Sequence, residues 1–206
     1  MPSILFINRV YPPSHGATGR VLEYVARGFV RAGWNVSVLA TGMPPASSLK
    51  PSTEVRDGVI IYRCQGNIHS KGNIFLRVIT SAVGIPSFFL GALQIPRNDV
   101  VVTMTDPPML LVVGVLIGIC KNSRLIHWAQ DLYPEIAEEV GVISKGGWIA
   151  WLLRGLSTLF MRAHHINIVP GQCMKDRLLA RGLSNSKIRV ILNLALLQKN
   201  LNQIKA

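Results

Sequence analysis

Apolar positions recur along this chain with two different periods, and segments of the two kinds alternate from one end to the other. Short apolar runs rich in β-branched residues predict buried strands. Longer segments with apolar residues three and four positions apart predict helices. Their alternation is typical of an α/β fold with a mostly parallel sheet and helices on both faces. Strands are expected at residues 4–7, 35–39, 59–62, 100–103, 124–128, 163–169 and 188–192, with a short additional strand near Val55.

One apolar segment does not fit a regular helix. Residues 74–93 form a long apolar run that Arg77 and Pro86 interrupt. A charge and a mid-segment proline are unfavourable in a membrane span, so we expect a kinked helix packed on the sheet. No repeat and no domain boundary is evident before Asn193, which predicts a single Rossmann-like domain. Regular helices are expected at residues 18–32, 109–120, 148–162 and 172–180, and a Pro/Ser-rich loop at residues 43–52.

The charge balance narrows the choice of partners. Lys and Arg number 22 against 10 Asp and Glu, a formal net charge of +12. Such an excess favours an anionic partner, either a membrane surface, a nucleic acid or a phosphorylated substrate, although it is also compatible with general solubility. The basic residues are scattered and not interleaved with aromatic residues, so we expect no nucleic-acid partner. With 49% apolar and 16% charged residues, the composition excludes a disordered chain.

Cysteine usage indicates the cellular compartment. Cys64, Cys120 and Cys173 lie far apart, and no pair has the spacing of metal ligands. Reduced thiols in the cytoplasm are the simplest interpretation. The chain opens with a predicted strand and has no basic segment or cleavage site typical of a secretory signal. We therefore expect a cytoplasmic protein without a bound metal or cofactor.

A glycine-bearing loop joins the first predicted strand to the first predicted helix. Residues 11–20 read YPPSHGATGR. Gly16 and Gly19 lack a Cβ, which lets the backbone turn sharply and come close to a ligand. The positive end of the helix dipole points at this loop and suits a phosphate. We predict substrate or phosphate binding by His15, Gly16, Gly19 and Arg20; a connection without a ligand is the alternative.

The string GATG also opens the cofactor loop of short-chain dehydrogenases. Here the first glycine lies well beyond the end of the strand, and Leu22 occupies the third glycine position of the fingerprint. The second predicted strand ends in Ala40 and Thr41, without an acid to hold a ribose hydroxyl. These three departures disfavour an oxidoreductase that uses a nicotinamide cofactor.

Four motifs in sequence order resemble the beginning of family 4 glycosyltransferases, most closely the sugar-transferring enzymes of bacterial surface-polysaccharide synthesis. Together they cover nearly the whole chain. The motifs are the strand followed by YPP and GATG up to Glu23, TDPP at residues 105–108, HWAQDLYPE at residues 127–135, and VPGQCMKDRL at residues 169–178 with KIRVILN at residues 187–193.

This resemblance implies a retaining enzyme with the B-type fold, in which two Rossmann-like domains face each other across a cleft. The first domain receives the acceptor and the second holds the nucleotide-sugar. Residues 1–192 would be the acceptor domain, and residues 193–206 the start of an interdomain linker or a tail. Its substrates would then be a nucleotide-sugar and a lipid-linked saccharide, bound productively only with a separate donor domain. We expect the isolated chain to be inactive, because transfer needs both substrates in near-attack geometry. A non-catalytic interaction or regulatory module derived from such an enzyme is the alternative.

The loop after the fifth predicted strand holds the candidate catalytic residue. In an open α/β sheet, ligands bind at the carboxyl ends of the strands, where this loop and the GATG loop are expected to meet. The resemblance places Asp131 on the acceptor side, where a carboxylate accepts a hydrogen bond from the attacking hydroxyl. A helix N-cap or an acid that orders the loop is the alternative. Many relatives carry His at the preceding position; Gln130 cannot take a proton, so we expect it to bind substrate.

Three further residues of these motifs have structural alternatives. His127 lies inside a predicted strand, as a substrate-binding residue or as a hydrogen-bonded core residue. Glu135 is expected in the first turn of a helix, where it complements the dipole. Asp106 of TDPP is expected to be a helix N-cap, and the prolines beside it to shape the wall of the cleft and start the helix.

The predicted helix at residues 148–162 has a broad apolar side that includes Trp148 and Trp151. Arg154, Thr158 and Arg162 form a narrow polar stripe on it. Such a helix suits the surface of an anionic membrane and an acceptor carried on a polyprenyl pyrophosphate, peripheral on the inner face of the cell membrane. A core helix with one solvated edge is the alternative.

Overall fold

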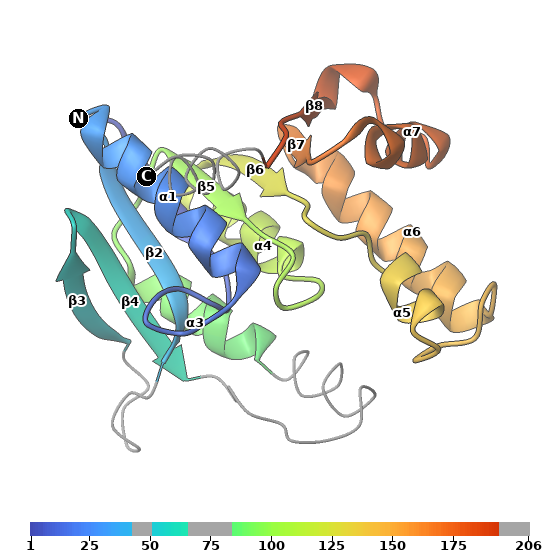
Figure 1. Ribbon diagram of the computed structural model, residues 1–206, viewed down its shortest axis with the longest axis horizontal. Coiled ribbons are helices and arrows are strands. Elements are labelled where there is room, and N and C mark those ends of the chain that lie inside the picture. Colours follow the sequence, from blue (N-terminus) through green and yellow to red (C-terminus); the bar gives the residue numbers. More distant parts are fainter. Residues whose placement is uncertain (43–50, 66–83, 194–206) are drawn as a thin grey trace, which may run out of the picture.

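The computed structural model describes residues 1–42, 51–65 and 84–193. Its centre is an eight-stranded sheet in the order β3-β4-β2-β1-β5-β6-β7-β8 (Figure 1). Neighbouring strands are parallel, except for the antiparallel pair of β3 and β4. The strands are β1 (Ser3–Ile7), β2 (Asn35–Gly42), β3 (Ser52–Arg56), β4 (Val59–Gln65), β5 (Val100–Thr103), β6 (Arg124–Trp128), β7 (Ile166–Val169) and β8 (Ile188–Val190).

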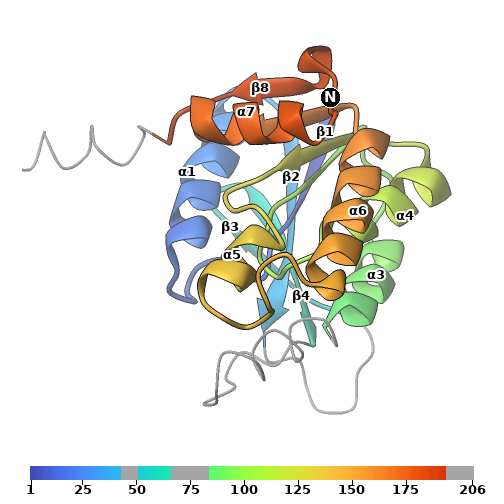
Figure 2. The ribbon, with the colours of Figure 1, turned by 90° about the vertical axis from the view of Figure 1, so that its right-hand side faces the viewer.

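Helices cover both faces of the sheet, which confirms the predicted fold class. α1 packs on one face over Phe6 and Val38, and α3 and α4 pack on the other over Leu5 and Ile7 (Figure 2). Both faces of β1 are therefore buried, so its sequence is a continuous apolar run and not an alternating one. The helices are α1 (Ala17–Arg31), α3 (Ile85–Gln94), α4 (Leu111–Lys121), α5 (Glu135–Glu139), α6 (Trp148–Ala163) and α7 (Gln172–Ala180), with a 3₁₀ turn at Asn185–Lys187.

The expected additional strand is present as β3, and its connection to β4 is a two-residue turn. Asp57 and Gly58 have φ values of 51° and 79°. Two consecutive positive φ angles are typical of the tight hairpin turn that Asp-Gly favours. The sixth predicted strand begins three residues later than expected, at Ile166, because α6 continues to Ala163.

Prolines act differently from the sequence-based expectation. Pro86 lies in the first turn of α3, so it starts this helix and does not kink it. Residues 66–83 lie outside the described residues. They include the first half of the predicted helical segment 74–93, so the predicted kink of that segment is not described as a whole. α4 begins only at Leu111, because Met109 has a φ of 62° and interrupts the chain between the prolines of TDPP and the helix.

Within the described ranges, no helix is both long and apolar enough to cross a bilayer.

The order of the strands places a topological switch point beside β1. The chain passes from β1 to β2 on one side and later returns to β5 on the other side. In open α/β sheets, ligands bind beyond the carboxyl ends of the strands near such a point. The loop of residues 8–16 follows β1, and the loop of residues 104–110 follows β5.

Candidate functional site

An ion pair links the two loops across the switch point. Nε of Arg9 lies 2.6 Å from Oδ1 of Asp106, and its Nη2 lies 3.1 Å from Oδ2. The backbone amide of Arg9 also donates to the carbonyl of Asp106, at 2.6 Å. Because Asp106 pairs with Arg9 and α4 starts beyond it without a side-chain cap, the prediction of an N-cap at Asp106 is wrong. Its carboxylate instead joins the loop after β5 to the loop after β1.

Arg63 on β4 anchors the YPP segment, and sequence reasoning missed it. The side chain is buried, and its guanidinium donates to the carbonyls of Tyr11 and Pro12. Nη2 also lies 2.7 Å from Oε1 of Glu54, so the charge of Arg63 is compensated. An arginine in an otherwise apolar strand was the only available signal, and its partner carbonyls lie about fifty residues away in the chain.

The two glycines of the GATG motif allow close packing within the chain. A Cβ on Gly16 would lie 3.0 Å from Cγ1 of Val10, and a Cβ on Gly19 would lie 3.0 Å from both that atom and the carbonyl oxygen of Val10. The start of α1 therefore rests on the backbone that follows β1. Glycine is needed for this approach, whether or not a ligand binds there.

The first turn of α1 presents donors to the crevice. Its N-cap residue is Gly16, which makes no side-chain cap, and no acid lies in the first turn. His15 and Arg20 flank this turn and are exposed. Free amides at a helix start attract anions. The predicted phosphate-binding residues thus lie together at one end of α1, and their role in binding stays a prediction.

Asp131 lies in the loop after β6 and is half-buried. Among the described residues, no hydrogen bond or ion pair engages its carboxylate, and the N-cap residue of α5 is Pro134. Burial, together with the nearby charge of Asp106, raises the pKa of the Asp131 carboxyl. Asp131 and the GATG turn are thus at the same edge of the sheet, connected through Asp106, Arg9 and Val10.

Gln130 is partly used by the chain itself. Its Oε1 accepts a hydrogen bond from Nδ2 of Asn193 at 2.6 Å, and its backbone amide donates to Oγ1 of Thr105 at 3.3 Å. Its Nε2 is buried and has no partner among the described residues. Within the described residues the amide nitrogen is thus unpaired inside the protein, while the oxygen end fixes the segment that follows β8.

His127 occupies the core position that was its structural alternative. The side chain is 0% exposed, and Nδ1 lies 3.1 Å from the carbonyl oxygen of Thr103. Burial and the adjacent His164 lower the pKa of His127 to about 3. Burial also lowers the pKa of His164 to about 4. Both imidazoles are neutral near pH 7, and a substrate-binding role for His127 stays a prediction.

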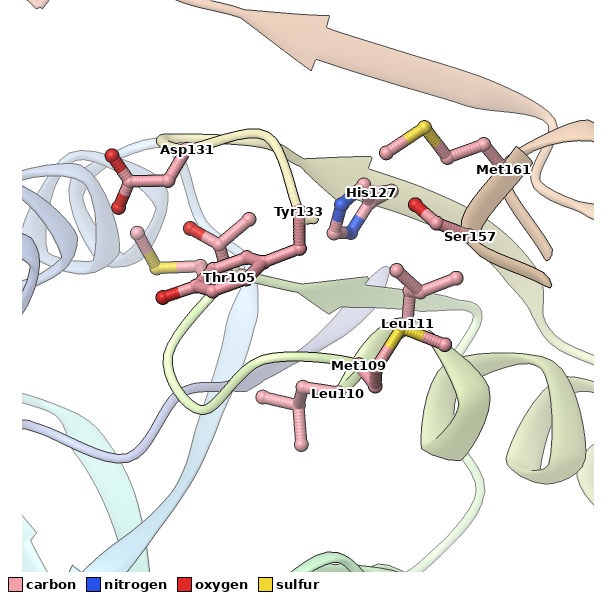
Figure 3. A pocket seen from close by; sticks show the side chains of 10 residues that line it. Thr105, Met109, Leu110, Leu111, His127, Asp131, Tyr133, Ser157 and Met161 are labelled. Atoms are coloured by element: carbon pink, nitrogen blue, oxygen red, sulfur yellow. The ribbon is translucent and has the colours of Figure 1, made fainter. Parts of the chain in front are cut away.

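A small cavity lies between the buried His127 and Asp131. His127, Ser157, Tyr133 and Asp131 are among its lining residues (Figure 3). Nε2 of His127 and Oγ of Ser157 are both buried without a partner in the described part of the chain. The volume of about 10 Å³ is close to the minimum for one water molecule.

A second and wider hollow lies on the other side of Asp131, between α5 and α7. Its volume is about 230 Å³. Apolar side chains of Leu132, Ile136 and Met174 line it, together with Cys173, Arg177 and three carboxylates. Asp131 lines both spaces.

Ion pairs hold α5 in place beside this hollow. Arg154 of α6 lies 3.0 Å from Oε1 of Glu135 and 2.5 Å from Oε2 of Glu138. Arg181, after α7, pairs with the other oxygen of Glu135. Burial alone would raise the pKa of Glu135, but the hydrogen bond from Arg154 and the charge of Arg181 lower it. Glu135 is also in the first turn of its helix, as expected.

Three solved structures show the same arrangement of strands and helices. They are sucrose-phosphate synthase from Thermosynechococcus elongatus (TM-score 0.62, 14% identity, covering 93% of this chain and 48% of that one), HepE from Anabaena in complex with UDP and glucose (TM-score 0.56, 14% identity, covering 98% and 50%), and α,α-trehalose 6-phosphate synthase from Burkholderia multivorans (TM-score 0.53, 12% identity, covering 90% and 44%). The chain thus spans about half the length of these proteins.

At such identities the likeness establishes the fold alone, which is the Rossmann-like domain of B-type glycosyltransferases. A comparison with curated protein sequences gives no match. The sequence model of the glycosyl transferase 4-like domain matches residues 16–193, from the GATG turn to the end of the described chain. The chain therefore belongs to the family of glycosyl transferase 4-like domains.

Proposed function

We propose that this chain is the acceptor-side half of a retaining glycosyltransferase. The observation that carries the proposal is Asp131, a half-buried carboxylate without a partner in the described residues, at the crevice of a chain from this family. Residues 1–192 form the acceptor domain, and residues 193–206 begin the connection to a donor domain. The Anabaena HepE structure with UDP-glucose supports a nucleotide-sugar as the donor.

Asp131 accepts a hydrogen bond from the acceptor hydroxyl as this group attacks the sugar. A carboxylate with a raised pKa is a stronger proton acceptor than an exposed one, which favours this role. The adjacent Gln130, whose buried Nε2 has no partner in the described residues, orients the same acceptor. In the described part of the chain no cation pairs with Asp131, and the nearby Arg9 is occupied by Asp106.

The start of α1 receives the phosphates of the nucleotide-sugar when the donor domain closes over the crevice. Its uncapped amides and the exposed Arg20 supply the donors and the positive charge. The acceptor is a lipid-linked saccharide used in cell-surface polysaccharide synthesis, and the protein is peripheral on the inner face of the membrane. The net charge of +12 supports an anionic surface of this kind.

The test is sugar transfer by Asp131→Asn in the presence of a donor domain, on the same polypeptide or supplied separately. Membranes with endogenous lipid acceptors are incubated with a panel of radiolabelled nucleotide-sugars, and label in the lipid extract is counted. We expect a fall in kcat of roughly 10²- to 10⁴-fold, the usual contribution of a general base, with KM for the nucleotide-sugar little changed.

Asp57→Asn is the matched control, because Asp57 lies in the turn at the opposite edge of the sheet and tolerates asparagine at its positive φ. Unchanged turnover of Asp131→Asn would remove this residue from the mechanism. If no nucleotide-sugar is used and the chain instead co-purifies with a complete relative, the interaction-module alternative replaces the proposal.

A further inference from the structure

Much of the broad apolar side of α6 faces away from the protein. Trp148 and Trp151 are 75% and 73% exposed, and Leu159 is 60% exposed. Thr158, from the polar stripe, is buried, and Arg154 turns toward α5 to pair with its two glutamates. The predicted alternative of a core helix with a solvated polar edge is therefore wrong. The side of α6 that lies against the protein mixes Ala150 and Met161 with Ser157 and Thr158, while most of the broad apolar side faces outward.

Neighbouring helices extend this exposed apolar side. α4 contacts both α3 and α6, and the three lie side by side on one face of the sheet (Figure 2). Monomeric proteins rarely expose contiguous apolar surface over several elements unless it contacts another molecule. We call this surface the three-helix face; its exposed apolar residues are Leu90 and Leu93 on α3, Leu116 and Ile119 on α4, and Trp148, Ile149, Trp151, Leu152, Leu156 and Leu159 on α6.

The charges of these helices have one sign. None of the three helices contains Asp or Glu. Lys121 at the end of α4 and Arg162 at the end of α6 hydrogen-bond only to carbonyl oxygens within the described chain, so no carboxylate neutralises them. Arg97, just after α3, is bonded in the same way to the carbonyls of Lys121 and Asn122. The three-helix face is thus apolar with a basic rim, in which Lys121 and Arg162 bond to carbonyl oxygens and Arg97 also lies near the carboxylate of Asp99, whose pKa is lowered by hydrogen bonds from Ser3 and by this charge.

This combination decides between two occupants. A second copy of the chain would bring the same basic rim against itself, since a two-fold interface pairs identical surfaces, and like charges would oppose each other. An anionic bilayer supplies negative charge at the rim and an apolar layer beneath. Tryptophan is the residue that concentrates at the boundary between headgroups and acyl chains.

We propose that the three-helix face binds the surface of an anionic lipid bilayer, with Trp148 and Trp151 inserted at its interfacial layer. The biological role of this membrane contact rests on the proposed function. α6 follows the loop that carries Asp131 in the chain and is ion-paired to α5, which lies beside that loop. A bilayer held against α6 lies next to the crevice, where a lipid-linked acceptor has to be presented.

The test is flotation of the complete chain with vesicles of phosphatidylcholine mixed with phosphatidylglycerol. We expect binding that weakens in pure phosphatidylcholine and at high salt. The double variant Trp148→Ser/Trp151→Ser should bind about a hundredfold more weakly, roughly tenfold for each large apolar side chain removed from the interface. The blue shift of tryptophan fluorescence on vesicle addition should disappear in it.

Tyr24→Ser is the matched control, since Tyr24 is an aromatic residue 54% exposed on α1, on the other face of the sheet. All variants replace exposed side chains, so they should fold. Folding is verified by an unchanged Tm and by a near-ultraviolet circular dichroism spectrum that is unchanged outside the tryptophan bands. Unchanged vesicle binding of the double variant, or no binding by the parent chain, overturns the inference. A concentration-dependent dimer that the double variant abolishes would overturn it in favour of a second copy.

Transfer to a water-soluble acceptor analogue separates this inference from the proposed function. With a donor domain present, the double variant should keep this transfer while losing vesicle binding. If the parent chain fails to bind vesicles yet transfers sugar to the soluble analogue, the bilayer inference alone falls.

Discussion

His127 and His164 are two fully buried histidines that share Thr103 as a neighbour. The hydroxyl of Thr103 lies 3.2 Å from Nδ1 of His127 and 3.4 Å from Nε2 of His164. Neither imidazole has a carboxylate partner, so protonation of either one would place an unpaired charge in the core. This cluster makes the folded chain sensitive to acid in a range where carboxylates contribute little.

We expect the free energy of unfolding to fall as the pH is lowered from about 6.5, the pKa of histidine in an unfolded chain. The folded-state pKa values are about 3 for His127 and about 4 for His164, so between those values and 6.5 only the unfolded chain binds the protons. Each histidine then contributes a slope of up to about 1.4 kcal/mol per pH unit, favouring the folded state as the pH rises.

Urea unfolding between neutral pH and pH 5 measures this slope. His127→Asn retains a donor for the carbonyl of Thr103 but does not titrate, so its slope should be shallower than that of the parent chain by about one proton. Equal slopes for the two proteins would show that the protonation of His127 does not oppose folding.

At the scale of elements, α5 is a single short helix whose position depends on charges from two other elements. Arg154 of α6 and Arg181 after α7 converge on Glu135, and Arg154 also reaches Glu138. Glu138 is buried, so removing its partner leaves a carboxylate with little solvation. This network places the hollow between α5 and α7, and with it the open side of Asp131.

Arg154→Met should loosen α5 while the sheet stays intact. The substitution keeps the unbranched stem but removes the charge, and we expect a loss of about 1–3 kcal/mol, discounted from the fully buried case because Arg154 is partly exposed. Hydrogen exchange should accelerate in residues 131–147 and remain unchanged in β1 and β5. Arg154→Lys, which retains the charge, is the control, and equal protection of residues 131–147 in the methionine variant would contradict this account.

At the scale of the whole molecule, the loops after β1, β5 and β6 lie at one edge of the sheet. The chain covers about half the length of the solved structures it resembles. Because transfer requires donor and acceptor to be held together, the purified 206-residue chain should not turn over a nucleotide-sugar by itself. Release of free nucleotide is the measurement, and the same chain with a donor domain added is the positive control. Efficient release by the chain alone would contradict the assignment of residues 1–192 to the acceptor side.

The amino-acid sequence by itself determined the fold class and the edge of the sheet where the motifs meet. Periodicity depends on neighbours a few residues apart, and parallel strands joined by helices place their carboxyl ends on one side, so strand order was enough to predict that the GATG turn and Asp131 share an edge. The limits of β7 and the start of α4 were less well predicted, because α6 runs on and Met109 takes a left-handed conformation that no local pattern marked.

Only the tertiary structure decided what each side chain faces. A helical pattern shows that α6 has two unlike sides, but only the structure shows that Arg154 lies against the acids of α5 while Trp148 and Trp151 are exposed. Asp106 pairs with Arg9 and does not cap a helix, and Arg63 donates to the carbonyls of the YPP segment. These contacts join residues some fifty to a hundred positions apart in the chain. Which residues become partners depends on how the whole sheet brings its loops together. A local stretch of sequence contains only one of the two partners, so it cannot predict the pairing.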